Sequence, residues 1–412
     1  MSTVVLSINA GSSSLKTTLY AYGDEKELKS LAKAEVSNIN SQPAQLKYTS
    51  KDKQDKSDVD DVKDHKAAFG RILHAFLEDA SIEEVKSKDD IRYACHRVVQ
   101  GGDYHEDQLI TKETFEKIEA LEDLAPLHNA SAVSLMQACF ENLPSVTNVA
   151  CFDSAFHHTM PRHVKAYMID QKIAGEKGLR KYGFHGLSYS YITRAVAAHL
   201  RKPQEDINFI ALHLGSGASG CAIRKGKSID TTMGLTPVSG LPGGSRSGDI
   251  DPALIFHYTS DASKLSPSST KDLHISTAEE VLNKQSGWKA VTGTSNFAEI
   301  ARENAPESHQ LALDIFVDRI VGFVGNYYVK LGGEVDAIVF AGGIGERSTM
   351  LRKRVIEHVA CLGFTVDDKK NEQLDMGNDR VAEIGVHGNK KTLVCATDED
   401  YEMAYNTMMH PK

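Results

Sequence analysis

Hydrophobic residues fall in short runs along the chain, and small or polar residues follow most of these runs. The first run, Thr3–Ile8, is apolar and β-branched and predicts a strand, and Ser14–Ala21 predicts a second strand after a turn of small residues. Apolar residues at helical spacing predict a helix over His65–Glu78. Residues 41–66 form a dense mixed-charge run, for which we expect a solvated loop or a surface insertion.

Five later apolar runs share one order, in which the run is followed by a polar or glycine-bearing loop and often by a helical pattern. This order is typical of α/β proteins, whose ligands bind at the carboxyl ends of strands. The residues just after each run are therefore the first candidates for chemistry. The runs are Ile91–Val99, Val146–Phe152, Phe209–Leu214, Ala337–Phe340 and Thr392–Ala396.

A weak internal repeat links two of the predicted strands. Leu6–Lys16 can be laid over Ala211–Cys221, and both stretches have the pattern of strand, tight small-residue turn and strand. We expect each copy to begin one lobe of a duplicated fold.

Composition narrows the class of protein. The 412 residues suit two domains, and a formal net charge of −9 argues against nucleic acid as the main partner, although a local cluster of Arg and Lys would still bind a small anion. The six cysteines are scattered, which argues against a zinc site or a disulfide framework. The start lacks a signal-peptide pattern, and no apolar run approaches 18 residues. We expect a soluble protein of a reducing compartment, most simply the cytoplasm, with no membrane partner.

The first loop has the composition of a phosphate-binding loop without the usual pattern. A P-loop reads G-x-x-x-x-G-K-[ST], whereas Leu15 stands here in place of the second glycine between Gly11 and Lys16. Backbone N–H groups, serine hydroxyls and the lysine would suit an anion, and Asn9 would suit a phosphate oxygen or a metal-bound water. The alternative is a plain hairpin turn.

Three further candidates lie near strand ends in the first half of the chain. Arg97 within an apolar run is costly unless it is paired or binds a carboxylate or phosphate. His128 precedes a helical pattern that starts at about Ala130, and either a structural or a functional role suits it. Asp153 could hold Mg²⁺ through water, orient an arginine or cap a turn. The adjacent His157 and His158 are poorly placed as joint metal ligands, and we leave them out.

The chain beyond residue 180 adds four candidates. His185 lies between Phe184 and Gly186 at the front of a predicted helix. Residues 236–252 are poor in core-forming side chains and carry Arg246, which favours a ligand loop over a flexible surface loop. The glycines of AGGIGER are a weak nucleotide signal, and the carboxylates of TDEDYE suit Mg²⁺ or merely a helix N-terminus.

Taken together and in order, these stretches resemble acetate kinases. LSINAGSSSLK, RVVQGG, APLHN, FDSAFH, YGFHGLS, HLGSGASG, GDIDP, AGGIGE and ATDED carry the resemblance from Val5 to about Tyr405. The resemblance implies an α/β, duplicated two-lobe fold of the actin, sugar-kinase and Hsp70 type (RNase H-like), with mixed sheets flanked by helices. It implies an N-terminal lobe over residues 1–152 joined by 397–412, and a nucleotide-binding C-terminal lobe over 153–396.

The same resemblance implies an activity. We expect reversible, Mg²⁺-dependent transfer of the ATP γ-phosphoryl group directly to acetate, giving acetyl phosphate and ADP, by a homodimer; Mn²⁺ is an alternative metal. Family roles place Arg97 and Arg246 on acetate and the transferring phosphoryl group, His185 on the transition state, and His128 nearby. Residues that match those organising Mg²⁺ and phosphate are Asn9, Asp153 and Glu399.

Two further sets follow from the resemblance alone. A small apolar pocket for the acetate methyl group is implied at Val99, Leu127, Phe184 and Pro237. Positions implied on the nucleotide side are Ser12, Ser14 and Lys16 in the first loop, His213, Gly215, Ser216 and Gly217 in the second, and Gly342, Gly343, Ile344 and Gly345 beside adenosine.

The chain departs from the common pattern at Gln100, Ser216, Arg347 and in ATDED. Ser216 and Arg347 lie in motifs that the resemblance assigns to the nucleotide, so the identity of the phosphoryl donor stays open. Alternatives are a propionate or butyrate kinase, a pyrophosphate-using enzyme on the same scaffold, a non-catalytic nucleotide-responsive module of the Hsp70 kind, and an acidic structural protein.

Overall fold

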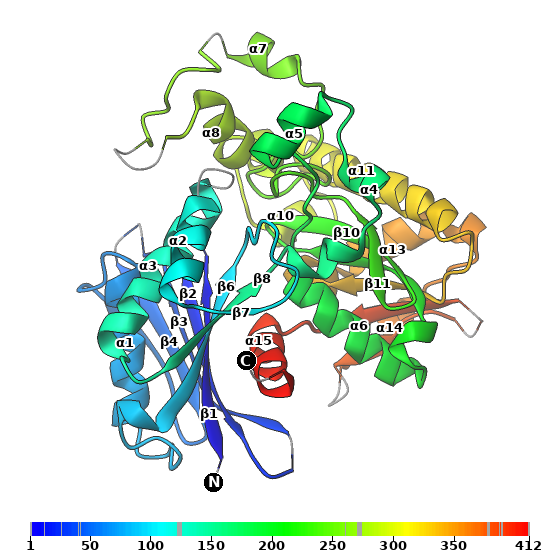
Figure 1. Cartoon of the computed structure of the whole chain (residues 1–412). Coiled ribbons are helices and arrows are strands. Elements are labelled where there is room, and N and C mark those ends of the chain that lie inside the picture. Colours follow the sequence, from blue (N-terminus) through cyan, green and yellow to red (C-terminus); the bar gives the residue numbers. More distant parts are fainter. Residues whose placement is uncertain are drawn as a thin grey trace. The chain divides into compact units, whose positions relative to one another are not determined.

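The structure is a computed structural model, and it divides into two compact units (Figure 1). Unit 1 comprises residues 1–155 and 398–412, and unit 2 comprises residues 156–397. The predicted boundaries lie three residues and one residue away from these. The structure describes residues 2–11, 13–25, 27–39, 41, 43–121, 126–259, 261–269, 274–376, 380–386, 388 and 390–410, with backbone only at 126–128. Within those ranges, no helix is long and apolar enough to cross a membrane.

Unit 1 is built on an eight-stranded mixed sheet in the order β5-β4-β3-β2-β1-β6-β8-β7. The central strands β1, β6 and β8 run parallel, and β2 to β5 add antiparallel hairpins at one side. The elements of this unit are β1 (Thr3–Ala10), β2 (Leu15–Tyr22), β3 (Leu28–Ser37), β4 (Ala44–Ser50), β5 (Gln54–Val59), α1 (His65–Glu78), β6 (Ile91–Val98), β7 (Gln108–Leu109), α2 (Lys112–Ala120), α3 (Pro126–Asn142), β8 (Thr147–Phe152) and α15 (Glu399–Met409).

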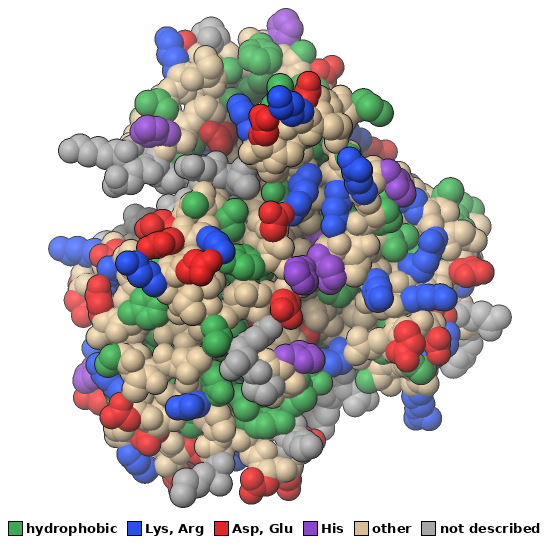
Figure 2. All heavy atoms as spheres, viewed as in Figure 1, with side chains coloured by type: hydrophobic (Ala, Val, Ile, Leu, Met, Phe, Trp, Pro, Cys, Tyr) green, Lys and Arg blue, Asp and Glu red, His purple; other side chains and the backbone are tan. Residues whose placement is uncertain are grey.

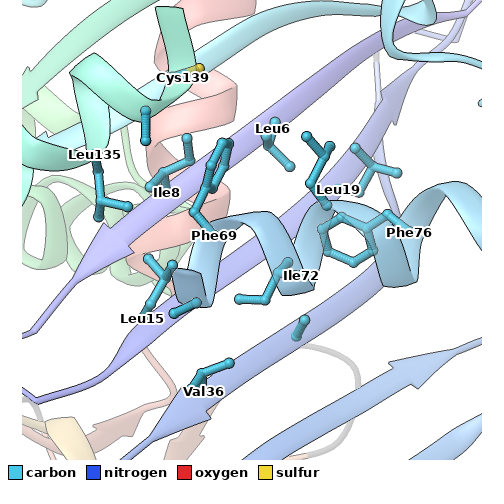
Figure 3. Packing of buried hydrophobic residues seen from close by; sticks show 14 of the residues in the cluster. Leu6, Ile8, Leu15, Leu19, Val36, Phe69, Ile72, Phe76, Leu135 and Cys139 are labelled. Carbon is cyan, nitrogen blue, oxygen red and sulfur yellow. The ribbon is translucent and has the colours of Figure 1, made fainter. Parts of the chain in front are cut away.

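Alternation along β1 separates the core of unit 1 from its chemistry. Leu6 and Ile8 pack with Phe69 of α1 and with α3 on one face of the sheet (Figure 3). The intervening residues Ser7 and Asn9 bond to the start of α15, which contacts β1, β2 and β6 (Figure 1). Since successive strand residues point to opposite faces, one strand supplies both the apolar layer and a polar layer under α15.

Our prediction for residues 41–66 is wrong. Residues 44–59 form the hairpin β4–β5 at the edge of the sheet, and α1 begins at His65. In β4, the buried residues Ala44, Leu46 and Tyr48 alternate with more exposed ones, a period-two pattern that the many lysines and aspartates mask in the sequence. Charged side chains on an edge hairpin are a usual protection against edge-to-edge pairing.

Unit 2 is built on a six-stranded sheet in the order β11-β10-β9-β12-β14-β13. Its elements are α4 (Arg162–Lys165), α5 (Gln171–Lys177), α6 (Gly186–Leu200), β9 (Asn208–Leu214), β10 (Ala218–Arg224), β11 (Lys227–Thr231), α7 (Leu254–Tyr258), α8 (Thr277–Lys284), α9 (Gly287–Thr292), α10 (Phe297–Ile300), α11 (Glu307–Lys330), β12 (Ala337–Ala341), α12 (Gly342–Arg347), α13 (Thr349–His358), α14 (Asp368–Glu372), β13 (Val381–Glu383) and β14 (Lys391–Cys395).

The strand β9 divides the faces of unit 2 as β1 does in unit 1. Ile210 and Leu212 belong to the large core that includes Phe316 of α11, while His213 bonds to Ser188 of α6. Helix α6 contacts β9, β13 and β14, and α11 contacts β9 and β10. Each unit therefore contains a hairpin whose first strand lies inside a mixed sheet. The hairpin begins unit 1, but in unit 2 it follows α4, α5 and α6, so the prediction that each copy begins a lobe holds for the first copy alone.

The first loop is a hairpin turn, and the missing P-loop glycine has a structural reason. β2 begins at Leu15, opposite Ala10 of β1, whereas a P-loop would continue into a helix. In the second copy, Leu214 pairs with Ala218 across the shorter turn 215–217. Two helices begin earlier than the sequence indicates: α3 begins at Pro126, and the glycines of AGGIGER form α12 itself.

Charge is spread over the molecular surface rather than gathered by sign on the side that Figure 2 shows. Acidic and basic side chains are interspersed there among polar and apolar ones. This distribution agrees with the modest net charge of −9.

The β4 assignment is testable with neighbouring substitutions. Leu46 is 5% exposed in the core of unit 1, so Leu46→Ala should lower the free energy of unfolding by about 2–5 kcal/mol. Lys47 faces outward on the same strand, so Lys47→Ala should stay within about 0.5 kcal/mol of wild type. Urea unfolding of both variants measures the difference, and equal effects would mean that 44–59 is not a packed hairpin.

Candidate active site

Arg97 is the centre of a charged cluster in unit 1. It lies one residue before the end of β6, and both oxygens of Asp153 accept from its Nε at 3.2 Å, while Oδ2 also accepts from Nη2 at 2.6 Å. Asp153 directly follows β8, the neighbouring parallel strand, which is why the two side chains meet. The Asp153 carboxylate is thus committed to orienting a guanidinium, one of the roles that the sequence leaves open.

Asn9 and Glu399 complete this cluster from the two ends of the chain. Arg97 Nη1 donates to Asn9 Oδ1 at 3.1 Å and lies 3.3 Å from Glu399 Oε2. Asn9 Nδ2 donates to the same Glu399 oxygen at 3.1 Å. Burial disfavours the charged guanidinium, but Asp153 and Glu399 together raise the pKa of Arg97 above its usual value. The arginine is a fixed cation whose planar group is held by three neighbours.

The TDEDYE stretch divides its carboxylates among three tasks. Asp398 caps α15 by accepting from Tyr401 N–H at 3.0 Å, and Glu399 faces Arg97. Asp400 accepts from Thr18 Oγ1 at 3.0 Å and from Asn9 Nδ2 at 3.3 Å. Burial and the neighbouring Asp398 raise the pKa of Asp400 to about 6. Asp400, which was not among our site residues, holds Asn9 in place.

His185 occupies a strained corner in unit 2. It is the N-cap residue of α6 with φ of 59° in the left-handed region, an unusual conformation that clusters at functional sites. Its side chain makes no capping bond; Nδ1 instead lies 2.8 Å from Ser219 Oγ on β10. The ring stacks on His213 of β9, with centroids 4.2 Å apart. The imidazole is fixed by its neighbours on two strands.

Arg246 lies beside His185 at the second small-residue turn. A Cβ added at Gly217 would lie 3.0 Å from Arg246 Nη1 and 3.6 Å from His185 Nε2. The structure therefore brings three predicted site residues, Gly217, His185 and Arg246, to one point. Glycine at 217 leaves the room that a larger residue would take from the arginine.

Main-chain bonds hold the Arg246 loop in shape. Gly244 N–H donates to Ser216 O at 2.8 Å, which ties the loop to the β9–β10 turn. On its other side, the N–H groups of Ser286 and Trp288 donate to Ser245 O and Gly243 O, both at 3.1 Å. The loop is an ordered part of the unit, which excludes the flexible-loop alternative.

A cavity of about 400 Å³ in unit 2 is lined by two of the four residues predicted beside adenosine. Gly343 and Ile344 of α12 line it together with Gly215 and Ser216, and Arg347 lines it as well. Gly342 has φ of 74°, and a Cβ there would come within 2.8 Å of Leu214 O, so glycine lets α12 approach β9. Sequence reasoning missed the other lining residues, which are Ser295, Asn296, Phe297, Ala298, Ala301, Ser348 and Thr349.

Arg352 supports this cavity from behind. It is 1% exposed, and its Nη1 donates to the carbonyls of Gly345 and Glu346 at 2.9 and 2.8 Å. Carbonyl groups near a helix C-terminus lack intrahelical partners, and a buried arginine satisfies them here. Burial lowers the pKa of Arg352 to about 10.

The first loop belongs to unit 1. Lys16 is exposed and stands opposite Asn9 in the β1–β2 register, while Ser14 O accepts from Gly11 N–H at 2.8 Å. His65 Nε2 lies 2.8 Å from Gly11 O and holds the turn from α1. Ser12 and the side chains of Leu127 and His128 lie outside the described residues. Lys16 and Ser14 as nucleotide residues remain predictions.

The residues predicted to form the acetate pocket are divided between the two units, and Gln100, a departure from the family pattern, has a structural role. Val99 is half-buried after β6, whereas Phe184 and Pro237 are buried in unit 2. Gln100 is fully buried and closes the RVVQGG turn by accepting from Gly102 N–H at 2.9 Å. Its backbone N–H donates to Asn129 at 3.0 Å, so glutamine here has a structural task.

His157, which we left out, supports the backbone next to His185. Its Nε2 lies 2.9 Å from the carbonyl oxygen of Phe184, which can only accept, so Nε2 carries the proton. Its Nδ1 lies 2.8 Å from Ser228 Oγ. Burial lowers the pKa of His157 to about 4, so the ring is neutral. The residue that His157 holds directly precedes His185, a relation that only the tertiary structure shows.

The side chains predicted to organise the metal, Asn9, Asp153 and Glu399, would bind a metal through oxygen atoms. Among the residues that the structure describes, no three or more His, Cys, Asp or Glu side chains are disposed to hold a metal. Mg²⁺ suits such a site, because it binds through one or two carboxylates and takes its other ligands from water and phosphates. The Glu399 side chain is 14% exposed and that of Asp153 only 1%, so the fit favours Glu399.

Comparisons with known proteins agree with the motifs. The model of the acetokinase family matches residues 4–405. A probable acetate kinase of Emericella nidulans is 54% identical over 407 residues, which cover 98% of this chain and 96% of that protein. Among solved structures, Porphyromonas gingivalis acetate kinase has a TM-score of 0.84 at 33% identity, covering all of both chains. A propionate kinase of Francisella tularensis has a TM-score of 0.85 at 33% identity, covering 98% of each.

These matches confirm the family resemblance and the α/β fold with two mixed sheets. They span nearly the whole chain, and the relatives are matched over nearly their whole length. The chain therefore belongs to the acetokinase family.

Proposed function

We propose that this protein is an acetate kinase, which reversibly transfers the γ-phosphoryl group of ATP to acetate and forms acetyl phosphate and ADP. The observation that carries the proposal is the pairing of His185 Nε2 and Arg246 Nη1 at Gly217, beside a 400 Å³ cavity lined by glycines. A non-catalytic nucleotide module would need the cavity but not this pair, nor the oriented Arg97.

The chemistry asks for positive charge rather than for a general base. Acetate is ionised near pH 7, because carboxyl pKa values lie around 4. The difficulty is to bring two anions together, and phosphoryl transfer depends mainly on positioning and electrostatic stabilisation. Arg97 and Arg246 supply fixed cations, and His185 supplies a hydrogen-bond donor. We infer direct in-line transfer, because the set provides charge and orientation without an activated nucleophile.

We assign acetate to Arg97 and the transferring phosphoryl group to Arg246 and His185. Both oxygens of Asp153 already accept from Arg97, so Asp153 orients this arginine and is not our choice as a metal ligand. Val99 of unit 1, and Phe184 and Pro237 of unit 2, remain predictions for contacts with the acetate methyl group.

Mg²⁺ would be held on the Glu399 side of the Arg97 cluster, with Asn9 fixing the Glu399 carboxylate. When bound, a divalent metal neutralises charge on the phosphate oxygens. In this assignment Glu399 binds, Asn9 orients, and Asp400 holds Asn9 through its carboxylate.

ATP is the proposed donor because the glycine segment of α12 lines a cavity of nucleotide size. Gly343, Ile344 and Ser216 would border adenosine and its phosphates. Arg347 adds a cation to the cavity wall, at a position where the pattern that this chain resembles has asparagine. Pyrophosphate would need none of the 295–301 wall.

A homodimer is proposed from an apolar surface of unit 2. Among the described residues, seven large hydrophobic side chains on α7, α9 and α11 are exposed. We assign six of them, all except Val329, to this surface, and four of the six line an apolar cavity of about 270 Å³. Exposed apolar patches of this kind mark interaction surfaces, and a second copy of the chain is the expected occupant. The six are Leu254, Phe256, Tyr258, Val291, Leu311 and Ile315.

Product trapping tests the activity directly. With ATP and Mg²⁺, hydroxylamine should trap an acyl phosphate whose formation depends on acetate. Relative kcat/KM for acetate, propionate and butyrate, with ATP or pyrophosphate as donor, should be highest for acetate with ATP. Each extra methylene changes discrimination by about 1–3 kcal/mol. If ATP were hydrolysed at the same rate with and without acetate, the proposal would be refuted in favour of a nucleotide-responsive module.

Removal of the Arg246 side chain should lower turnover far more than it lowers the stability of the protein. Arg246→Ala should raise the barrier by about 2–4 kcal/mol, by analogy with the loss of an oxyanion-hole donor. Arg224→Ala removes an exposed arginine of the same unit and serves as the matched control. Steady-state kinetics and thermal unfolding separate the effects; a folded Arg246→Ala protein with near-normal kcat would remove Arg246 from the mechanism.

The Asn9 assignment predicts a selective effect on the metal–nucleotide side. Asn9→Ala frees the Glu399 carboxylate, so the KM for Mg²⁺–ATP should rise more than the KM for acetate. Asn142→Ala, which removes a local bond to Ala138 O on α3, is the control. A larger change in the KM for acetate would mean that Asn9 acts through Arg97 instead.

A further inference from the structure

Behind His185 lies a hydrogen-bonded chain of two hydroxyl groups. Tyr189 Oη lies 2.5 Å from Ser219 Oγ, and Ser219 Oγ lies 2.8 Å from His185 Nδ1. Tyr189 and Ser219 are fully buried, and His185 is 9% exposed. Tyr189 lies one helical turn beyond His185 on α6, and its N–H donates to His185 O at 2.9 Å. The three groups are therefore held together by both backbone and side chains.

The number of protons on Tyr189, Ser219 and His185 determines which group donates in each of these hydrogen bonds. A buried phenol must donate its proton, and Ser219 Oγ is its acceptor within the described part of the chain. The other group directed at the Tyr189 oxygen is the backbone N–H of His213, which is itself a donor. Burial also raises the pKa of Tyr189 well above its usual value, so the phenol keeps its proton.

Ser219 then has one proton left to donate. Its Oγ accepts from Tyr189, and its remaining hydrogen-bond partner is His185 Nδ1, which must therefore accept. A proton on Nδ1 would leave the buried Ser219 hydroxyl hydrogen without an acceptor, which is unfavourable in a buried site. The nearby Arg246 guanidinium further disfavours a second positive charge on the ring.

We propose that Tyr189 and Ser219 are positioning residues that hold His185 as the neutral tautomer with its proton on Nε2. Nε2 is the ring nitrogen that lies near Gly217 and Arg246. His185 thus presents an N–H donor at the point assigned to the transferring phosphoryl group, and it works as a dipole rather than as an imidazolium. The tautomer of His185 does not depend on the proposed function. The catalytic consequence of the tautomer rests on the proposed function.

The stacked ring of His213 helps to orient the His185 ring, but it is not part of the hydrogen-bonded series from Tyr189 through Ser219 to His185. Its Nδ1 lies 2.7 Å from Ser188 Oγ, which lies 2.9 Å from Thr397 Oγ1. His213 and Ser219 are opposite each other in the β9–β10 register, so two adjacent strands of one sheet hold the His185 ring, one by stacking and the other by a hydrogen bond. The sheet provides a rigid base, which a donor aimed at a transition state requires.

The tautomer is measurable independently of turnover. In protein labelled with ¹⁵N-histidine, the His185 ring signals, assigned by their loss in His185→Gln, should show a protonated Nε2 and an unprotonated Nδ1. Ser219→Ala and Tyr189→Phe should shift this pattern toward a mixture of tautomers. Tyr191→Phe, another buried tyrosine of α6, should leave it unchanged.

Kinetics of the same variants supply the second readout. Ser219→Ala should lower kcat by up to about 10²-fold, as for a lost oxyanion donor, with smaller changes in the KM values for acetate and ATP. Tyr189→Phe should act in the same direction, and thermal unfolding checks that both variants fold. A wild-type spectrum with Nδ1 protonated would overturn the relay, as would unchanged tautomer and kcat in both variants. If the wild-type protein shows no acetate-dependent turnover, the proposed function fails while the ring spectrum still decides the relay.

Discussion

The Arg97–Asp153 ion pair is the interaction on which the rest of unit 1 depends. Asp153 is fully buried, and a buried carboxylate is tolerated only when a cation and hydrogen bonds satisfy it. The pair requires β6 and β8 to be parallel neighbours with their carboxyl ends aligned. The same guanidinium reaches Asn9 on β1 and Glu399 on α15, so it ties the start of the chain to its end. The charge needed for chemistry is also the constraint that closes the unit.

Unit 2 differs from unit 1, because the feature that its neighbouring residues compensate is backbone strain at His185. His185 adopts a left-handed backbone conformation, and the surroundings compensate for this strain. His157 holds the preceding carbonyl, Ser219 holds the ring, and the glycine at 217 leaves space for Arg246. Buried neutral groups set the direction of each donor, and the arginine supplies the charge beside them.

Both units contain a similar hairpin but use its turn differently. In unit 1 the turn after β1 is tied down by His65 and leaves Lys16 exposed. In unit 2 the turn after β9 bonds to the Arg246 loop through Ser216 O and lines the cavity. Small residues serve in both places because the backbone itself must approach a partner closely.

The sequence by itself determined the family, most of the strands and the residues at their ends. Apolar runs followed by glycines and single polar residues locate chemistry because parallel strands gather their carboxyl ends at one edge. The sequence did not reveal the β4–β5 hairpin, whose alternation of Leu46 and Tyr48 is hidden among charges. Nor did it show that Asp153 serves Arg97, that Asp400 holds Asn9, or that His157 and Ser219 fix the His185 corner. These relations join residues that are distant in sequence, and only the packing of strands and helices decides which polar groups become each other's partners.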